Sequence, residues 1–205
     1  MRIAVFGGTG GTGRQIIEQA LDAGHQISAL VRDPNRLSEA SKQANIIVGD
    51  VLNAQKVCET ISGADAVAVS LGGRIDSPEN TVSQGTKNVI TCMHELGIKR
   101  LIVVTSLGVG NSKNQVPMAF KLVMKTVMRK IMADKERQEQ FVQNSGLDWV
   151  IVRPGELSDD PPSGAYIFGT DTSIIAGKVS RADLAEFVLR NLNDHQFLRQ
   201  AVAIT

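Results

Sequence analysis

A glycine-rich run near the start of the chain has the spacing of a phosphate-binding turn. The segment Gly7–Gly13 reads GGTGGTG and fits both G-x-x-G-x-x-G and G-x-G-x-x-G. In such a turn one glycine permits the bend, a second lets backbone approach a pyrophosphate, and a third lets the next helix pack closely. Hydroxyls of Thr9 and Thr12 add possible donors. We expect a dinucleotide site here; the alternative is a tight turn without a ligand.

Two arginines follow the second apolar run of the sequence. Arg32 ends that run, where an NAD-binding protein usually places an acidic residue for the ribose 2′-hydroxyl. Arg36 follows one helical turn later, and two guanidinium groups suit a 2′-phosphate dianion. NADP is therefore favoured over NAD. Asp33 would argue for NAD if it points inward, and the alternative without a ligand is a solvated charged loop.

Two further strand ends carry residues suited to a nucleotide. Asp50 can accept a hydrogen bond from the adenine amino group while Val51 packs on the ring, or Asp50 can instead cap the next helix. After a later strand, Leu71 and Gly72 offer backbone that can approach a dinucleotide. Arg74 can reach a phosphate or an anionic substrate, or it can be an ordinary surface arginine.

The elements that must position these residues alternate along the chain. Short apolar runs, typical of strands buried on both faces, occur at Ile3–Phe6, Ile27–Val31, Ile46–Val48, Ala66–Val69, Leu101–Val104, Trp149–Val152 and, at the end, Ala201–Ile204. Segments with helical spacing lie at Gly11–Ala23, Asn35–Gln43, Ala54–Ile61, Pro78–Leu96, Pro117–Asn144 and Arg181–Leu192. This alternation predicts one α/β domain over residues 1–205, a Rossmann-type doubly wound parallel sheet. We expect the substrate crevice at the carboxyl ends of its strands.

Composition and charge exclude several classes of protein. The 22 basic and 21 acidic residues leave a net charge of +1, so no overall field favours nucleic acid. No stretch reaches the roughly 20 apolar residues of a membrane helix, and Ile3–Phe6 is too short for a signal peptide. We expect a cytoplasmic monomer. Cys58 and Cys92 are expected as reduced core residues, and the scattered histidines predict no metal site.

The usual catalytic acid of reductases with such a sheet is missing. That acid is the tyrosine of a Tyr-x-x-x-Lys motif, whose lysine lowers the tyrosine pKa. The single tyrosine is Tyr166, and position 170 is a threonine. Lys135 lies four residues after Ile131, where a tyrosine would be required, so it is most simply read as a solvated helix lysine. The absence argues against alcohol dehydrogenation by this route.

Together these residues resemble the atypical short-chain dehydrogenases/reductases, and most closely their single-domain biliverdin-IXβ reductase/flavin reductase group. The resemblance extends over nearly the whole chain. The segments that carry it are Phe6–Gly13, Leu30–Asp33 with Arg36–Leu37, Val48–Leu52, Leu71–Arg74, Thr105–Ser106, Ser145–Leu147, Arg153–Gly155 and Ser163–Tyr166. The glycine turn and Arg-Pro-Gly are common to the wider branch, whereas Val-Arg-Asp, Gly-Asp-Val-Leu and Gly-Ala-Tyr point to this group.

The resemblance implies a set of cofactor-binding residues. They are Gly7, Thr9, Gly10, Gly11 and Thr12 for the pyrophosphate, Arg32 and Arg36 for the 2′-phosphate, Asp50 and Val51 for adenine, and Leu71, Gly72 and Arg74 along the cofactor. Thr105 and Ser106 would lie beside the nicotinamide, with Pro154, Gly155, Glu156 and Leu157 on its far side. Glu156 stands where the best-known relatives carry a histidine, and it could donate a proton only if burial raised its pKa.

A basic amphipathic segment has no counterpart of equal length in those relatives. Residues 117–132 place Lys121, Lys125 and Arg129 at intervals of four among methionines and branched residues. The segment is interpreted as a lid over a flat substrate, as a partner or membrane-surface site, or as an ordinary helix with a solvated basic face.

The leading hypothesis is an NADPH-dependent reductase of a planar acceptor. A linear tetrapyrrole of the biliverdin type, or a flavin used as substrate, is electron-poor and needs stacking more than protonation. Ser106 is the first candidate for orienting the carboxamide or the acceptor, with Glu156 and Lys135 as further catalytic candidates. The alternative is a non-enzymatic NADP(H)-sensing regulator, and a weaker one is an isomerase or epimerase.

Overall fold

The apolar runs of the sequence form a parallel sheet. The computed structural model describes residues 1–73 and 78–205. Its strands are β1 (Arg2–Phe6), β2 (Gln26–Val31), β3 (Asn45–Val48), β4 (Ala66–Val69), β5 (Arg100–Val104), β6 (Asp148–Pro154), β7 (Glu156–Ser158), β8 (Phe168–Gly169), β9 (Lys178–Ser180) and β10 (Gln200–Ile204). The described part of the chain orders eight of them in one sheet as β3-β2-β1-β4-β5-β6-β10-β8. Only β8 runs antiparallel to its neighbour there.

The register brings the turns after the strands to one edge of this sheet. Phe6 of β1 lies level with Leu30 of β2 and with Val69 of β4. Chain order changes direction between β1 and β4, which are neighbours in the sheet. A doubly wound sheet binds ligands outside the carboxyl ends of its strands at such a point. The fold predicted from the sequence is confirmed.

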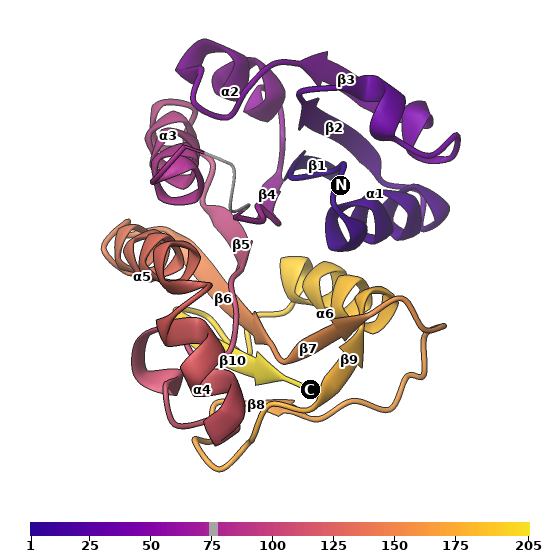
Figure 1. The fold of residues 1–205 in the computed structure, drawn as a ribbon. Coiled ribbons are helices and arrows are strands. Elements are labelled where there is room, and N and C mark those ends of the chain that lie inside the picture. The colour runs from indigo at the N-terminus through magenta and orange to yellow at the C-terminus, as the bar shows by residue number, and fades with distance from the viewer. Residues whose placement is uncertain (74–77) are drawn as a thin grey trace.

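Helices cover both faces of the sheet (Figure 1). They are α1 (Gly11–Asp22), α2 (Ala54–Ile61), α3 (Thr81–Glu95), α4 (Met118–Lys125), α5 (Arg129–Gln143) and α6 (Arg181–Asn193). Residues of α1 and α6 belong to one buried apolar cluster, and residues of α2, α3 and α5 belong to another on the opposite face. Among the described residues, no helix combines the length and apolar character that a bilayer span requires.

The structure corrects three expectations about the elements. The helix expected at Asn35–Gln43 is two short turns, Pro34–Arg36 and Ser41–Gln43, because side chains such as Ser38 hydrogen-bond the local backbone instead. The helix expected at Pro117–Asn144 is split into α4 and α5. The break follows Thr126, whose hydroxyl donates back to the Leu122 carbonyl at 2.9 Å and whose backbone leaves the helical region. The short strands β7, β8 and β9 were not expected.

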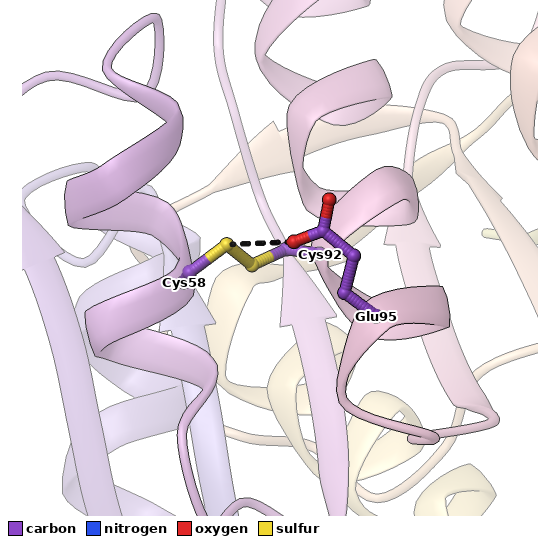
Figure 2. Close-up of side chains that lie close together, drawn as sticks. All are labelled: Cys58, Cys92 and Glu95. Carbon is purple, nitrogen blue, oxygen red and sulfur yellow. Dashed lines mark hydrogen bonds between the residues drawn. A yellow bond between two sulfur atoms is a disulfide. The ribbon is translucent and has the colours of Figure 1, made fainter.

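The two cysteines differ from the expectation of free, reduced core residues. Helices α2 and α3 lie side by side and bring the Cα atoms of Cys58 and Cys92 to 5.4 Å, where the two sulfurs are bonded (Figure 2). The pairing arises from the sequence-distant packing of two helices, which a cysteine count does not reveal.

Candidate functional site

A cleft of about 370 Å³ opens at the carboxyl ends of β1 to β4. Its lining comes from the turns after these strands and from the start of α3. The residues are Phe6, Gly7, Thr9, Gly10, Leu30, Val31, Arg32, Arg36, Gly49, Asp50, Val51, Ser70, Leu71, Gly72, Gly73, Thr81 and Val82. Nine of the eighteen residues predicted to bind the cofactor thus line this one cavity, whereas Gly11 and Thr12 of the glycine turn do not.

The glycine turn leaves no room for side chains. Gly7 has a φ of +91°, and a Cβ on it would lie 2.2 Å from the Ser70 carbonyl oxygen. A Cβ on Gly13 would lie 2.2 Å from the Gly7 carbonyl oxygen, which also accepts a hydrogen bond from the Gly10 N–H at 3.0 Å. The turn leads directly into α1, whose N-cap Gly10 lines the cleft and makes no side-chain cap hydrogen bond to the first N–H groups. Gly11 is exposed at this helix start and Thr12 is buried.

The charged residues after β2 point in different directions. Arg32 and Arg36 line the cleft, and both are exposed. Asp33 does not line it, because its carboxylate accepts the Asn35 N–H at 3.0 Å and begins the short turn Pro34–Arg36. A third arginine, Arg14 of α1, supports this turn by donating to the Arg36 carbonyl. The cleft therefore presents two cations at the end of β2, the strand end that meets the cofactor ribose in dinucleotide-binding folds of this kind.

The end of the cleft that follows β3 is formed by Asp50 and Val51. Asp50 accepts the Leu52 N–H at 2.9 Å, whereas Asn53 is the residue that caps α2. Of the two sequence interpretations of Asp50, helix capping is wrong, since Asn53 performs it. Val51 is buried, and its carbonyl oxygen accepts a hydrogen bond from the Asn88 amide at 3.0 Å. Leu71 and Gly72 close the cleft, and Arg74 lies outside the described residues.

The start of α3, which lines the cleft, is held by a residue that sequence reasoning missed. The Asp134 carboxylate of α5 accepts the backbone N–H groups of Val82 and Ser83 at 2.9 and 3.2 Å. Asp134 is only 7% exposed. It acts as a helix cap supplied from another element, a role that local sequence patterns do not reveal.

A buried ion pair lies behind the end of β5. Thr105 is buried, and its hydroxyl donates to Glu139 of α5 at 2.7 Å. The same carboxylate accepts Arg153 Nε at 2.9 Å and Arg153 Nη2 at 2.6 Å. The Thr105 hydroxyl is therefore held by the fold, as is its backbone N–H, which donates to the Val152 carbonyl oxygen at 2.8 Å. Glu139 and Arg153 thus form an ion pair that supports this strand end. In the sequence, Arg153 stands out only as part of the Arg-Pro-Gly segment, and the pair is not predicted.

Lys135 differs from the solvated lysine that its segment suggested. It is half-buried, and its Nζ donates to the Thr105 carbonyl oxygen at 3.1 Å. Burial lowers the pKa of Lys135 to about 8, against the opposing effect of the nearby Glu139 and Asp134 carboxylates. A lysine with such a pKa can hold or release a proton near neutral pH. Lys135 bonds the carbonyl of Thr105, the residue before Ser106, and this places its proton at the end of β5.

A second cavity, of about 310 Å³, lies at the carboxyl ends of β5 and β6. Its lining is Ser106, Leu107, Val116, Pro117, Phe120, Pro154, Gly155, Glu156, Ala176, Gly177 and Lys178. Ser106 donates its hydroxyl to the Leu107 carbonyl at 3.0 Å. Glu156 is exposed, so the burial that a carboxylic acid donor would need is absent. Leu157 does not line this cavity and packs against the core.

Tyr166 belongs to neither cavity. Its ring packs in an aromatic cluster with Phe168 and Phe187, and its hydroxyl hydrogen-bonds Glu186. Burial, with the Glu186 carboxylate, raises the pKa of Tyr166 to about 12. The one tyrosine is therefore unsuited to proton transfer in either cavity.

Within residues 1–73 and 78–205, the one group of three potential metal ligands with atoms within 4.8 Å of one another is Cys58, Cys92 and Glu95. In this structure the two sulfurs are bonded to each other and offer no thiolate. That no metal is required stays a prediction.

Known proteins share both the sequence and the fold of this chain. A family model described as NAD(P)H-binding matches residues 7–195. ChuY, an anaerobillin reductase from Escherichia coli O157:H7, is 26% identical with a TM-score of 0.85, covering 100% of this chain and 96% of its own. A reductase of Aspergillus terreus, pytE, is 26% identical over 99% of this chain and 97% of its own length.

A short-chain dehydrogenase/reductase from Veillonella parvula, solved in complex with NADP, has a TM-score of 0.82 at 18% identity, covering 99% of this chain and 93% of its own. At that identity it shows the shared fold alone. The family model, by contrast, spans the glycine turn, both cavities and α6. The chain therefore belongs to the NAD(P)H-binding family, with the fold of the atypical short-chain dehydrogenases/reductases that its motifs resemble.

Proposed function

We propose that this protein is an NADPH-dependent reductase that transfers hydride to a planar acceptor, a flavin or a linear tetrapyrrole. One observation carries the proposal: two cavities with different linings lie at the same edge of the sheet. The cleft over β1 to β4 carries the glycine turn and two arginines, and the cavity over β5 and β6 is lined mainly by apolar side chains. The end of β5, with Thr105 and Ser106, lies between them in the sheet order.

The residues of the cleft fit NADPH. The N–H groups at the start of α1 and the turn Gly7–Gly13 would hold the pyrophosphate, and Arg32 and Arg36 would hold the 2′-phosphate. Asp50 and Val51 would hold adenine, while Leu71 and Gly72 would lie along the ribose. When bound, NADPH supplies the hydride. The residues of the chain bind and orient it.

The second cavity fits the acceptor. Leu107, Val116, Pro117, Phe120 and Ala176 offer apolar contacts for a flat ring system, and Pro154 and Gly155 shape its wall. Lys178 at the rim is exposed and pairs with the exposed Asp160 at 2.7 Å, and it can exchange this partner for a carboxylate or phosphate of the acceptor. The resemblance to ChuY, described as an anaerobillin reductase, supports a tetrapyrrole-class acceptor.

Two residues at the end of β5 would serve the chemistry. Ser106, whose hydroxyl now bonds the Leu107 carbonyl, can rotate to orient the carboxamide or the acceptor. Lys135 would act as a positioning residue that also holds a proton beside this strand end, since its pKa is about 8. Glu156 would contact the acceptor at the rim without donating a proton.

The test is oxidation of NADPH by the purified protein in the presence of single acceptors. The acceptors are FMN, a biliverdin-type tetrapyrrole and, as a non-planar comparison, an aliphatic ketone. We expect NADPH consumption with a planar acceptor and none with the ketone. A variant carrying Val116→Asp, which places a charge in the apolar cavity, should lose reduction while NADPH binding persists.

Normal NADPH binding without reduction of any planar acceptor would contradict the proposal. That outcome would support the NADP(H)-sensing alternative, especially if a partner protein bound only one redox form of the cofactor. Failure to bind NADPH would contradict both functions.

A further inference from the structure

The Cys58–Cys92 bond joins α2 to α3 (Figure 2), and α3 lines the cleft at its start. Val51, which lines the cleft, lies three residues before the start of α2. Helix α3 begins with Thr81 and Val82, which also line the cleft. The bond closes a separation of 34 residues, within which Ser70–Gly73, Thr81 and Val82 of the cleft lining lie. The spacing of α2 and α3 therefore bears directly on the width of the cleft.

Val51 depends on α3 for its position. A Cβ added to Gly85 of α3 would lie 2.5 Å from Val51 Cγ1, so the valine side chain rests directly on that helix. Its carbonyl oxygen accepts the Asn88 amide at 3.0 Å. Asn88 lies one helical turn before Cys92. The disulfide and the contacts of Val51 thus hold the same two helices together, at successive turns of α3.

The surroundings of the disulfide favour thiol–disulfide exchange over a purely structural bond. Cys58 is half-buried and can be reached by a thiolate, whereas Cys92 is 1% exposed. The Glu95 carboxylate lies 3.7 Å from Cys58 Sγ, where it can accept the S–H of a reduced Cys58. Val57, Ile61, Val89 and Met93 are buried between the helices and the sheet, so the fold has a core that is independent of the bond.

We propose that Cys58 and Cys92 form a reversible thiol–disulfide site whose disulfide form binds NADP(H) more tightly. The proposal rests on the NADPH-binding function proposed above. Reduction frees α2 from α3 at this point and lets the wall at Val51 move outward. The partner is a dithiol reductant, and a disulfide compound is the oxidant in the reverse direction.

The exchange balances in two steps. A thiolate of the dithiol attacks Cys58 Sγ, forms a mixed disulfide and releases Cys92, which takes up a proton. The second thiol of the reductant then attacks the mixed disulfide and releases Cys58 as a thiol. The protein gains two electrons and two protons, and the dithiol becomes a disulfide.

The experiment measures NADPH affinity in both redox states of the full chain. Protein is oxidised with glutathione disulfide or reduced with dithiothreitol, free thiols are counted, and NADPH is titrated by fluorescence. We expect no free thiol in the oxidised protein and two in the reduced protein. The dissociation constant for NADPH should rise about five-fold or more on reduction, the lower range of measured coupling between sites.

The Cys58→Ser variant is the control. Its NADPH affinity should match that of the reduced protein and should not respond to dithiothreitol. Equal affinity of the two redox states of the natural chain would overturn the inference while leaving the proposed function intact. Two free thiols after oxidation would also overturn it, and NADPH binding in neither state would overturn the proposed function as well.

Discussion

At the scale of residues, cofactor preference depends on which charges after β2 face the cleft. The sequence predicts the arginines at this place because the end of the second strand meets the cofactor ribose in such folds. It does not predict where Asp33 points. That depends on a local hydrogen bond to the Asn35 N–H, which turns the carboxylate away from the cleft that Arg32 and Arg36 line.

Replacing both arginines, Arg32→Ala with Arg36→Ala, tests this arrangement. Hydrogen bonds to charged groups contribute about 1.5–3 kcal/mol each, so NADPH affinity should fall by roughly 100-fold or more. NADH affinity should change by only a few-fold, because NADH lacks the 2′-phosphate. Calorimetric titration of both cofactors measures the effect. The matched control is Lys42→Ala, an exposed cation paired with Glu39 outside the cleft. Equal losses for NADPH and NADH would contradict the assignment.

Lys135 is the residue whose importance the sequence understates. A lysine within a charged helical segment is usually solvated, and only the packing of α5 against the end of β5 shows that Lys135 reaches the Thr105 carbonyl. Its lowered pKa follows from this burial, which local sequence does not encode.

The lowered pKa of Lys135 predicts a pH dependence. Lys135 is protonated below about pH 8 and loses its proton as the pH rises through that value. If its ammonium supports catalysis, kcat/KM for the acceptor should fall above about pH 8. In Lys135→Arg the fall of kcat/KM should move to higher pH, because the guanidinium keeps its proton. In Lys135→Met the fall should disappear, and kcat/KM should be lower at every pH. A fall near pH 8 that persists unchanged in Lys135→Arg would contradict the role.

At the scale of elements, α5 fixes the site by reaching two strand ends and one helix start. Asp134 holds the start of α3, Lys135 bonds the backbone after β5, and Glu139 pairs with Arg153 of β6. The sequence predicts α1, α2, α6 and the main strands within a few residues, since their apolar spacing is regular, but it joins α4 and α5 in one helix. It does not predict which polar residues of α5 turn inward. It also misses the disulfide and the short strands β7 to β9, all of which depend on contacts between distant segments.

The Glu139–Arg153 pair predicts a stability effect. Their side chains are 3% and 5% exposed. Glu139→Gln would leave the Arg153 charge buried without its partner, which costs about 3–5 kcal/mol and lowers Tm by roughly 10 °C. Glu136→Gln is the matched control, because Glu136 makes a largely solvated pair with Lys113 and its loss should cost at most about 1 kcal/mol. Thermal unfolding followed by circular dichroism measures both. Equal Tm values for the two variants would contradict the structural role of Glu139.

At the scale of the whole molecule, the net charge is only +1, but the carboxyl edge of the sheet has two halves with different linings. The β1–β4 half presents the glycine turn and two arginines. The β5–β6 half presents a mainly apolar cavity whose lining includes Phe120 of α4 and Pro117, the residue before that helix. The sequence predicts the first half because its motif is local and contiguous. The second half is assembled from β5, β6, α4 and residues 176–178, so only its strand-end residues could be expected.

The central claim is that hydride passes from NADPH in the first half to a planar acceptor in the second. The most direct measurement uses NADPH deuterated at nicotinamide C4, on one face or the other, with a biliverdin-type tetrapyrrole, and mass spectrometry of the product. One labelled form should transfer its deuterium to a carbon of the acceptor, and the other should not. A reduced product without deuterium from either form, or no reduction while NADPH is bound, would contradict it.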